Sequence, residues 1–179
     1  RMKGKKRWGK WAWGAAAALI LLTGCAGPQP SPQKPEMILE NSACVVSMNG
    51  VEVEGRCSRS LEGIASFSVE SPQAMAGWEV RREQDSCWVS MEGISLQRDG
   101  GVMEESLFGR LFSALDSAAY GELTWEEGQW HGALSSGEAL VLETDEAGRP
   151  ASLEVPTWQL EAQFSSHSQA ADGTPLTVS

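Results

Sequence analysis

The sequence lacks the residue patterns by which most enzymes are recognised. It has two histidines, His131 and His167, and it contains no G-x-S-x-G, H-E-x-x-H, P-loop or G-x-G-x-x-G motif. The spacing of a calcium loop is also missing. Adjacent acidic pairs are no more frequent than chance gives at this composition, although a carboxylate pair of the glycosidase kind stays open as an alternative. We therefore expect a protein that is not an enzyme and that binds no metal and no cofactor.

Basic residues are scarce beyond the first ten positions. Six of the 14 lysines and arginines lie within residues 1–10, which leaves eight, whereas all 24 acidic residues follow residue 24. From Cys25 onward the net charge is therefore 8 − 24 = −16. This charge excludes nucleic acid as a partner, because proteins that bind it carry basic patches. It also disfavours a domain lying flat on anionic lipid. The acidic surface serves solubility, and the length suits one domain.

The sequence has only one apolar run of note, and that run is short. Residues 1–10 carry six basic side chains and no acid, and residues 11–22 are uncharged and mostly apolar. A helix that spans a bilayer needs about 20 such residues. The two segments therefore favour an export signal. An ordinary signal peptide and an N-terminal membrane anchor are the alternatives.

The tetrapeptide Leu22-Thr23-Gly24-Cys25 resembles the lipobox of bacterial lipoproteins. In that family the cysteine sulfur receives a diacylglyceryl group, with acyl chains such as palmitate, and the signal peptide before it, here residues 1–24, is removed. Each buried methylene contributes about 0.8 kcal/mol, so two acyl chains form an anchor that hardly dissociates. The resemblance implies lipidation of Cys25 and a place on the extracytoplasmic face of the cell membrane.

The rest of the chain divides by composition into three parts. Residues 25–41 contain four prolines, which predict a stiff, extended linker. Residues 42–165 carry the patterns of strands and a helix. Residues 166–179 are polar, and we expect them to be disordered.

The domain opens with a hairpin signal at Asn49-Gly50, because both central positions of a two-residue turn need positive φ. The turn sets Cys44 opposite Gly55. One face of the hairpin is expected to be buried and the other solvated. The expected buried face carries Cys44, Val46, Met48, Val51, Val53 and Cys57, and the solvated face carries Ser47, Glu52 and Glu54.

Alternating apolar and polar residues continue to the end of the domain and predict eight to eleven short strands in a meandering antiparallel sheet. The segments after the first hairpin are residues 64–70, 78–83, 87–91, 94–96, 123–125, 130–134, 139–144, 151–155 and 158–164. One segment differs from these. Glu104–Ala119 places Leu107, Phe108, Leu111, Phe112 and Leu115 on one stripe, which predicts an amphipathic helix. We expect Glu104 and Glu105 in its first turn, near the positive end of the helix dipole.

One helix covers a sheet of ten strands only if the sheet curls around it. We therefore predict an α+β fold, a curved and unclosed antiparallel sheet (a half-barrel) with one main helix across its concave face. This layout resembles the unclosed barrels of the LolA, LolB and LppX type, which carry or sense lipid-like molecules. The stretches FSVESPQAMAGW, SLFGRLFSALD and DEAGRPASLEV are similar to small Firmicutes lipoproteins of the germination-lipoprotein (GerS) type. That resemblance implies association with a cell-wall amidase.

Two functions follow from these observations. One is a non-catalytic interaction module for an envelope or cell-wall protein. The other is a carrier or sensor of an apolar, lipid-like ligand held between helix and sheet, because ligand pockets are mostly apolar. A filled space under the helix favours the module, and an open cavity favours the carrier. The side chains expected to line such a cavity, or to fill the core in its place, are Trp78, Trp158, Leu107, Phe108, Leu111 and Phe112.

Three cysteines follow Cys25, and export permits disulfides. The hairpin register makes Cys44 and Cys57 diagonal neighbours, about 7–8 Å apart. A disulfide needs Cα atoms no further apart than about 6.8 Å. Cys87 belongs to a strand that is not adjacent to theirs. We expect all three thiols to stay reduced on the inner face of the sheet.

Overall fold

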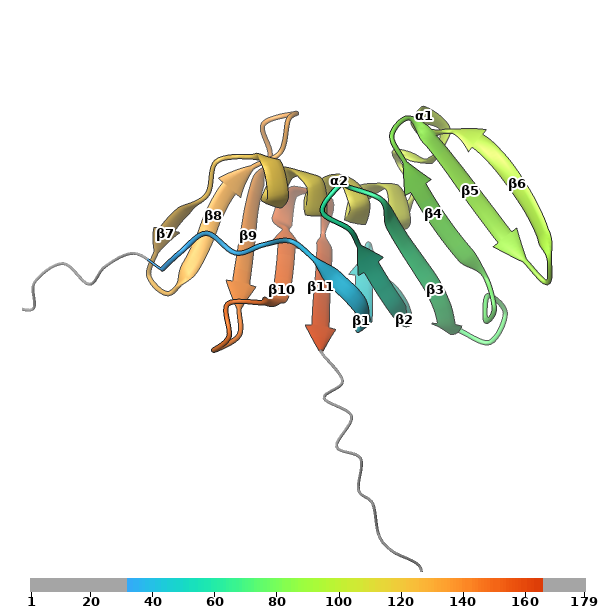
Figure 1. Ribbon diagram of the computed structural model, residues 1–179, viewed down its shortest axis with the longest axis horizontal. Helices are drawn as coiled ribbons and strands as arrows, with labels where there is room; N and C mark the ends of the chain where they lie inside the picture. Colours follow the sequence, from blue (N-terminus) through green and yellow to red (C-terminus); the bar gives the residue numbers. More distant parts are fainter. Residues whose placement is uncertain (1–31, 166–179) are drawn as a thin grey trace, which may run out of the picture. The chain divides into compact units, whose positions relative to one another are not determined.

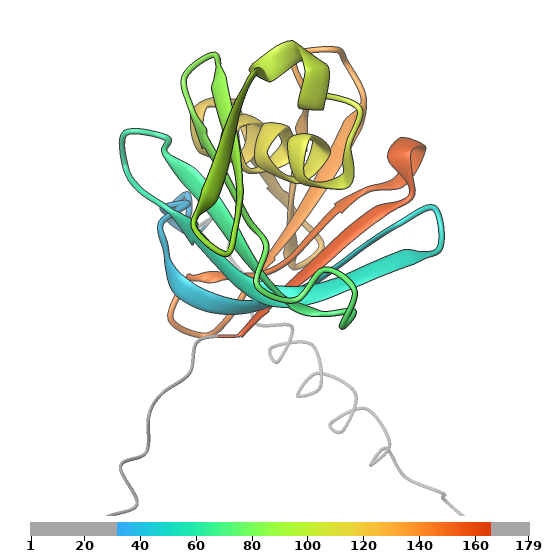
Figure 2. The same cartoon turned by 90° about the vertical axis from the view of Figure 1, so that its right-hand side faces the viewer.

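The computed structural model describes residues 32–165, which form one eleven-stranded antiparallel sheet with its main helix on the concave side (Figures 1 and 2). The predicted fold class, an unclosed half-barrel with one main helix, is confirmed. The predictions for Cys25, for the signal peptide over residues 1–24 and for the tail over residues 166–179 lie outside the described residues.

The elements run along the chain in two meanders with the helices between them. They are β1 Leu39–Met48, β2 Val51–Arg59, β3 Ala65–Ser71, β4 Glu79–Glu83, β5 Ser86–Met91, β6 Ile94–Asp99, α1 Gly100–Met103, α2 Leu107–Tyr120, β7 Thr124–Glu126, β8 Gln129–Ala133, β9 Ala139–Thr144, β10 Pro150–Val155, the 3₁₀ turn η1 Pro156–Trp158, and β11 Leu160–Ser165. The strand order is β6-β5-β4-β3-β2-β1-β11-β10-β9-β8-β7. The first and last strands of the domain therefore pair at the centre, and β6 and β7 are the two edges.

The first hairpin has the predicted register. Asn49 and Gly50 both have positive φ, 52° and 80°, and Cys44 lies opposite Gly55. Among its expected buried residues, Val51 is instead exposed. It follows the turn directly and so lies at the tip of the hairpin.

The three cysteines of the domain are free and buried, as expected. Cys57 lies opposite Ser42, so Cys44 and Cys57 are diagonal neighbours in the sheet. The hydrogen bond with the Cys57 thiol, together with burial, raises the pKa of the Cys44 thiol. Burial raises the pKa of Cys87 as well, although the nearby Arg82 opposes that shift.

The main helix α2 begins three residues later than the sequence suggests. The Ser106 hydroxyl accepts a hydrogen bond from the Gly109 N–H at 3.1 Å, which is the geometry of an N-cap. Glu104 and Glu105 consequently precede the helix, and its first turn contains no acid. The expectation that these glutamates lie in the first turn of the helix is therefore wrong. Glu105 instead forms an ion pair with Arg110.

The folded domain also begins earlier than residue 42. Within the predicted linker, Pro35 and Met37 are buried, and β1 starts at Leu39. We call residues 32–38 the N-terminal strap. Lys34 fastens this strap to the end of α2, because its Nζ donates to the carbonyl oxygens of Ala119 and Gly121, at 2.9 and 2.6 Å. Cationic groups are favourable at that end of a helix.

Candidate functional site

The space between α2 and the sheet is filled. Leu111 and Leu115 are 0% exposed and Phe112 is 1% exposed, and the Phe108 ring lies against Phe67 of β3 with centroids 5.3 Å apart. These large side chains meet the buried alternating residues of the central strands, such as Leu153. The stripe predicted from the sequence is therefore core, and its members fill the concavity.

The six candidate lining residues do not form one surface. Phe108, Leu111 and Phe112 come together in the core, whereas Leu107 is only partly buried. The two tryptophans are partly buried at separate margins of the core: Trp78 precedes β4, and Trp158 ends η1. The Cζ atom of Arg110 lies 4.0 Å from the centroid of the Trp158 ring. This cation–π contact covers the Trp158 ring at the margin of the core.

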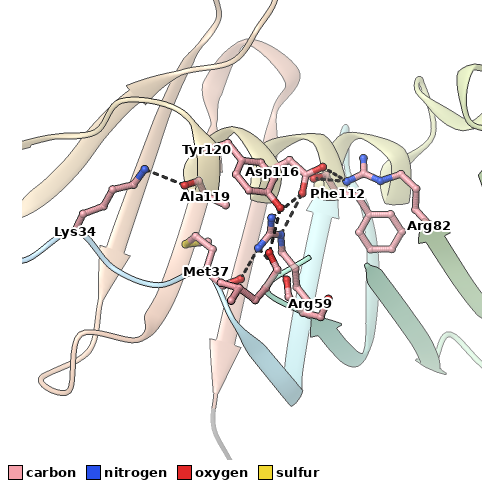
Figure 3. A network of polar contacts seen from close by, with 10 residues as sticks. Lys34, Met37, Arg59, Arg82, Phe112, Asp116, Ala119 and Tyr120 are labelled. Atoms are coloured by element: carbon pink, nitrogen blue, oxygen red, sulfur yellow. Dashed lines mark hydrogen bonds and ion pairs between the residues drawn. The ribbon is translucent and has the colours of Figure 1, made fainter. Parts of the chain in front are cut away.

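A polar cluster that the sequence analysis missed holds α2 to the sheet (Figure 3). The Asp116 carboxylate accepts hydrogen bonds from Arg59 of β2, at 3.1 and 3.0 Å. It also pairs with Arg82 of β4. Arg59 donates further to the Met37 carbonyl of the strap at 2.9 Å. One carboxylate on the helix thus joins two strands and the strap.

Burial explains why this cluster matters for the fold. The Arg59 side chain is only 2% exposed, and a buried charge needs a partner of opposite sign. A signal for the cluster was present in the sequence. Arg59 continues the inward row of Cys57, Arg82 continues that of Val80, and Asp116 lies four residues after Phe112 on the helix.

Beside this cluster lies a hollow of about 210 Å³, bordered by Arg82, Asp85, Glu104 and Asp116. Arg82 and Asp116 already form an ion pair with one another. In the part of the chain that the structure describes, no group of three His, Cys, Asp or Glu side chains is placed to hold a metal ion. Over the same residues, no helix has the length and apolar character to cross a membrane.

Within residues 32–165, no helix lies over the convex face of the sheet (Figure 2). Several glutamates lie on this face. A shallow hollow of about 490 Å³ crosses the central strands of this face. Val45 lies in it, 38% exposed. The glutamates that border the hollow are Glu54, Glu70, Glu143, Glu154 and Glu161.

Two of these glutamates are a like-charge pair. Glu154 of β10 lies directly opposite Glu161 of β11, and like charges in such positions are destabilising. Neither forms an ion pair with a described side chain, whereas Glu70 pairs with Arg56 at 3.2 Å. The centre of the convex face therefore concentrates negative charge that the domain itself does not neutralise.

Comparison with known proteins gives similarity at the level of structure only. No protein-family model matches the chain, and no curated protein matches it. Among solved structures, the chain is similar to a DUF1329 family protein from Desulfovibrio piger ATCC 29098, with 9% identity, a TM-score of 0.37, and 69% of this chain and 81% of that chain covered. It is also similar to the LolA superfamily protein NE2245 from Nitrosomonas europaea, with 14% identity, a TM-score of 0.33, and 76% and 66% covered. Identities and TM-scores are low, and the description of the fold rests on the chain's own strand order.

Proposed function

We propose that this protein is a non-catalytic interaction module, anchored to the extracytoplasmic face of the cell membrane by a lipid on Cys25, that binds an envelope or cell-wall protein through the convex face of its sheet. The observation that carries the proposal is the contrast between the two faces. The concave face is filled by α2, whereas no helix of residues 32–165 lies over the convex face, which holds the like-charge pair Glu154 and Glu161 beside a hollow.

The charge of the domain and of the convex pair indicates which kind of partner would fit. Across residues 32–165 the domain has one lysine, seven arginines and 23 acidic residues. A basic surface patch on the partner would neutralise the Glu154–Glu161 pair, which gives electrostatic complementarity and speeds association. Binding of this kind weakens as salt screens the charges.

The alternative, a carrier of an apolar ligand, is less well supported. A ligand under α2 would have to displace Leu111, Phe112 and Leu115, which are fully buried. It would also have to break the contacts of Asp116 with Arg59 and Arg82. The free-energy cost of displacing these side chains and breaking these contacts disfavours a cavity that opens when a ligand binds.

The test compares two double variants with the same change in charge. Glu154→Lys with Glu161→Lys reverses the convex pair, while Glu126→Lys with Glu127→Lys reverses two exposed glutamates at the β7 turn. The full-length chain is captured from membranes, and the proteins bound to it are quantified at low and high salt. We expect the convex variant alone to lose its partner. Equal capture by both variants would contradict the proposal.

A further inference from the structure

Trp88 of β5 differs from the other tryptophans of the domain. Of the five tryptophans between residues 32 and 165, four are buried in the core or pack against it, namely Trp78, Trp125, Trp130 and Trp158. Trp88 is partly exposed. Its neighbours in the strand, Cys87 and Val89, belong to the core or pack against it, so the alternation of the strand places Trp88 on the convex face. The indole is therefore a feature of the surface.

Polar side chains border Trp88 on this face. β4, β5 and β6 form one end of the sheet (Figure 1). Trp88 lies opposite Arg81 of β4 and opposite Gln97 of β6. Along its own strand, the nearest residues on the same face are Ser86 and Ser90. The large ring is therefore bordered along β5 by side chains much smaller than itself.

A hollow of about 270 Å³ lies beside the ring. Trp88 supplies the aromatic part of its lining. The polar part of the lining comes from Glu79, Arg81, Glu83, Ser90 and Ser95. The hollow thus combines one aromatic surface with a rim of hydrogen-bonding groups.

The polar groups of the hollow orient one another. The Ser90 hydroxyl donates to the Ser95 hydroxyl at 3.0 Å, and Arg81 Nη2 donates to Glu83 Oε2 at 3.1 Å. Glu79 forms no ion pair with a described side chain. The hollow therefore offers a ligand a guanidinium that donates, carboxylates that accept, and hydroxyls that do both.

The face of the Trp88 ring is not used by another cation of the domain. Guanidinium groups lie over the rings of Phe112, Tyr120 and Trp158. Over residues 32–165, no such contact covers Trp88. The ring therefore keeps a face on which a ligand can stack.

This mixture of groups disfavours several classes of ligand. A purely apolar ligand would leave the carboxylates and hydroxyls without hydrogen-bond partners. An anion, including the phosphate of a nucleotide, would meet Glu79 and Glu83, and a cation would meet Arg81, which lies directly opposite Trp88. The class that fits is a neutral ring with C–H groups on its face and hydroxyl groups on its rim.

We infer that the hollow at Trp88 binds a neutral pyranose sugar. The C–H groups on one face of a pyranose ring carry partial positive charge and stack on the negative face of the indole. The sugar hydroxyls both donate and accept, so they pair with Ser90, Arg81 and Glu79 around the ring. An aromatic surface with a few placed polar groups is typical of small-molecule sites. The hollow does not involve β10 or β11, which carry the Glu154–Glu161 pair, so the inference stands independently of the proposed function.

Isothermal titration calorimetry tests the inference. The full-length chain, in a detergent without a sugar headgroup, is titrated with trisaccharides of glucose, galactose, mannose and N-acetylglucosamine. We expect at least one of them to bind with a Kd of about 1 mM or tighter. Trp88→Ala should weaken that binding about tenfold or more, the scale of one lost stacking contact, and Trp88→Phe should retain part of it because a ring remains. The matched control is Val45→Ala, which truncates another exposed apolar side chain of the convex face and should bind the sugar unchanged.

A second variant keeps the ring and fills the hollow. Ser90→Leu should abolish sugar binding while circular dichroism shows an unchanged fold. Binding of no sugar of the panel, or equal binding by Trp88→Ala and Val45→Ala, would overturn the inference. Choline is titrated in parallel, and its binding in place of the sugars would assign the hollow to a cation and overturn the inference as well.

Cosedimentation identifies the source of the sugar. Retention of the protein by insoluble cell-wall glycan, lost in Trp88→Ala, points to the polymer, and binding of trisaccharides without such retention points to free oligosaccharides. The double variant Glu154→Lys with Glu161→Lys keeps Trp88 and should bind the sugar like the unchanged chain. Failure of sugar binding and failure of protein capture are thereby distinguishable.

Discussion

The concave and convex faces of the sheet are built from alternate residues of the same strands, yet they differ in chemistry and in cover. On the concave side, Leu153 of β10 and Ala162 of β11 are opposite one another and lie fully buried with α2 in the core. The adjacent residue of each strand, Glu154 after Leu153 and Glu161 before Ala162, faces solvent, and the two glutamates form an unneutralised pair. The difference indicates that the inner face was built for stability and that the outer face accepts a small loss of stability, which we attribute to recognition.

The largest expected effect comes from truncating a buried side chain on the concave side of the sheet. Leu111→Ala removes a fully buried side chain from α2 and should lower the free energy of unfolding by about 2–5 kcal/mol, because it loses buried area and leaves a cavity. Chemical denaturation measures it. The control is Leu61→Ala, which truncates a leucine that is 68% exposed and should change the stability by less than about 0.5 kcal/mol. Equal losses would mean that α2 does not cover the sheet.

Removing the charge that ties α2 to the strands should have the next largest effect. Asp116→Asn leaves the buried Arg59 guanidinium without its counter-charge and should destabilise the protein by about 1–3 kcal/mol. The matched control, Glu83→Gln, breaks the exposed pair with Arg81, for which less than about 1 kcal/mol is expected. Urea denaturation of the two variants measures the loss in the free energy of unfolding. A loss for Glu83→Gln as large as that for Asp116→Asn would contradict a special role of the cluster.

A pH titration probes the buried thiols of the concave face. The pKa of Cys44 is raised by the hydrogen bond with Cys57 and by burial, so the native state keeps a proton that the unfolded chain releases above about pH 9. Stability should therefore be fully present below that pH and fall above it, at about 1.4 kcal/mol per pH unit for the thiol. Denaturation curves at several pH values measure the slope. Cys44→Ala should reduce the slope, and an unchanged slope would assign it to other groups.

The smallest expected effect comes from the convex face, where the substitution should raise the stability of the protein instead of lowering it. Glu161→Gln relieves the repulsion from Glu154 and should stabilise the protein by about 0.2–1 kcal/mol. Glu54→Gln, whose cross-strand neighbour is Val45, should give no gain. Thermal denaturation at low salt compares them. A gain at Glu161 that persists at high salt would show that the effect is not electrostatic, since salt screens exposed charges.

The sequence was sufficient for the features that depend on neighbouring residues. The Asn49-Gly50 turn predicted the register that places Cys44 opposite Gly55, and the stripe through Leu111 predicted the buried face of α2. Features that depend on contacts distant in the chain were missed. Lys34 contacts residues 85 and 87 positions away, and Arg59 contacts Asp116 across 57 positions. No local pattern marks which partner such a side chain will meet.

For a related reason, the sequence does not separate a ligand lining from core. The six side chains considered as a ligand lining were chosen for their size and apolar character, and those properties are shared by core residues and pocket residues. Only the exposed fractions of Leu111 and Phe112, which are near zero, separate the two cases. Conversely, Glu154 and Glu161 are seven positions apart, and only the η1 turn between their strands sets them opposite one another.

Native mass spectrometry of the full-length protein, released gently from its own membranes, tests the central claim most directly. We expect a complex with a protein partner that dissociates when Glu154 and Glu161 are both changed to Lys, and no lipid beyond the group attached to Cys25. A stoichiometric non-covalent lipid, retained by this double variant and lost when Leu111→Trp overfills the space under α2, would contradict the interaction module and identify a carrier.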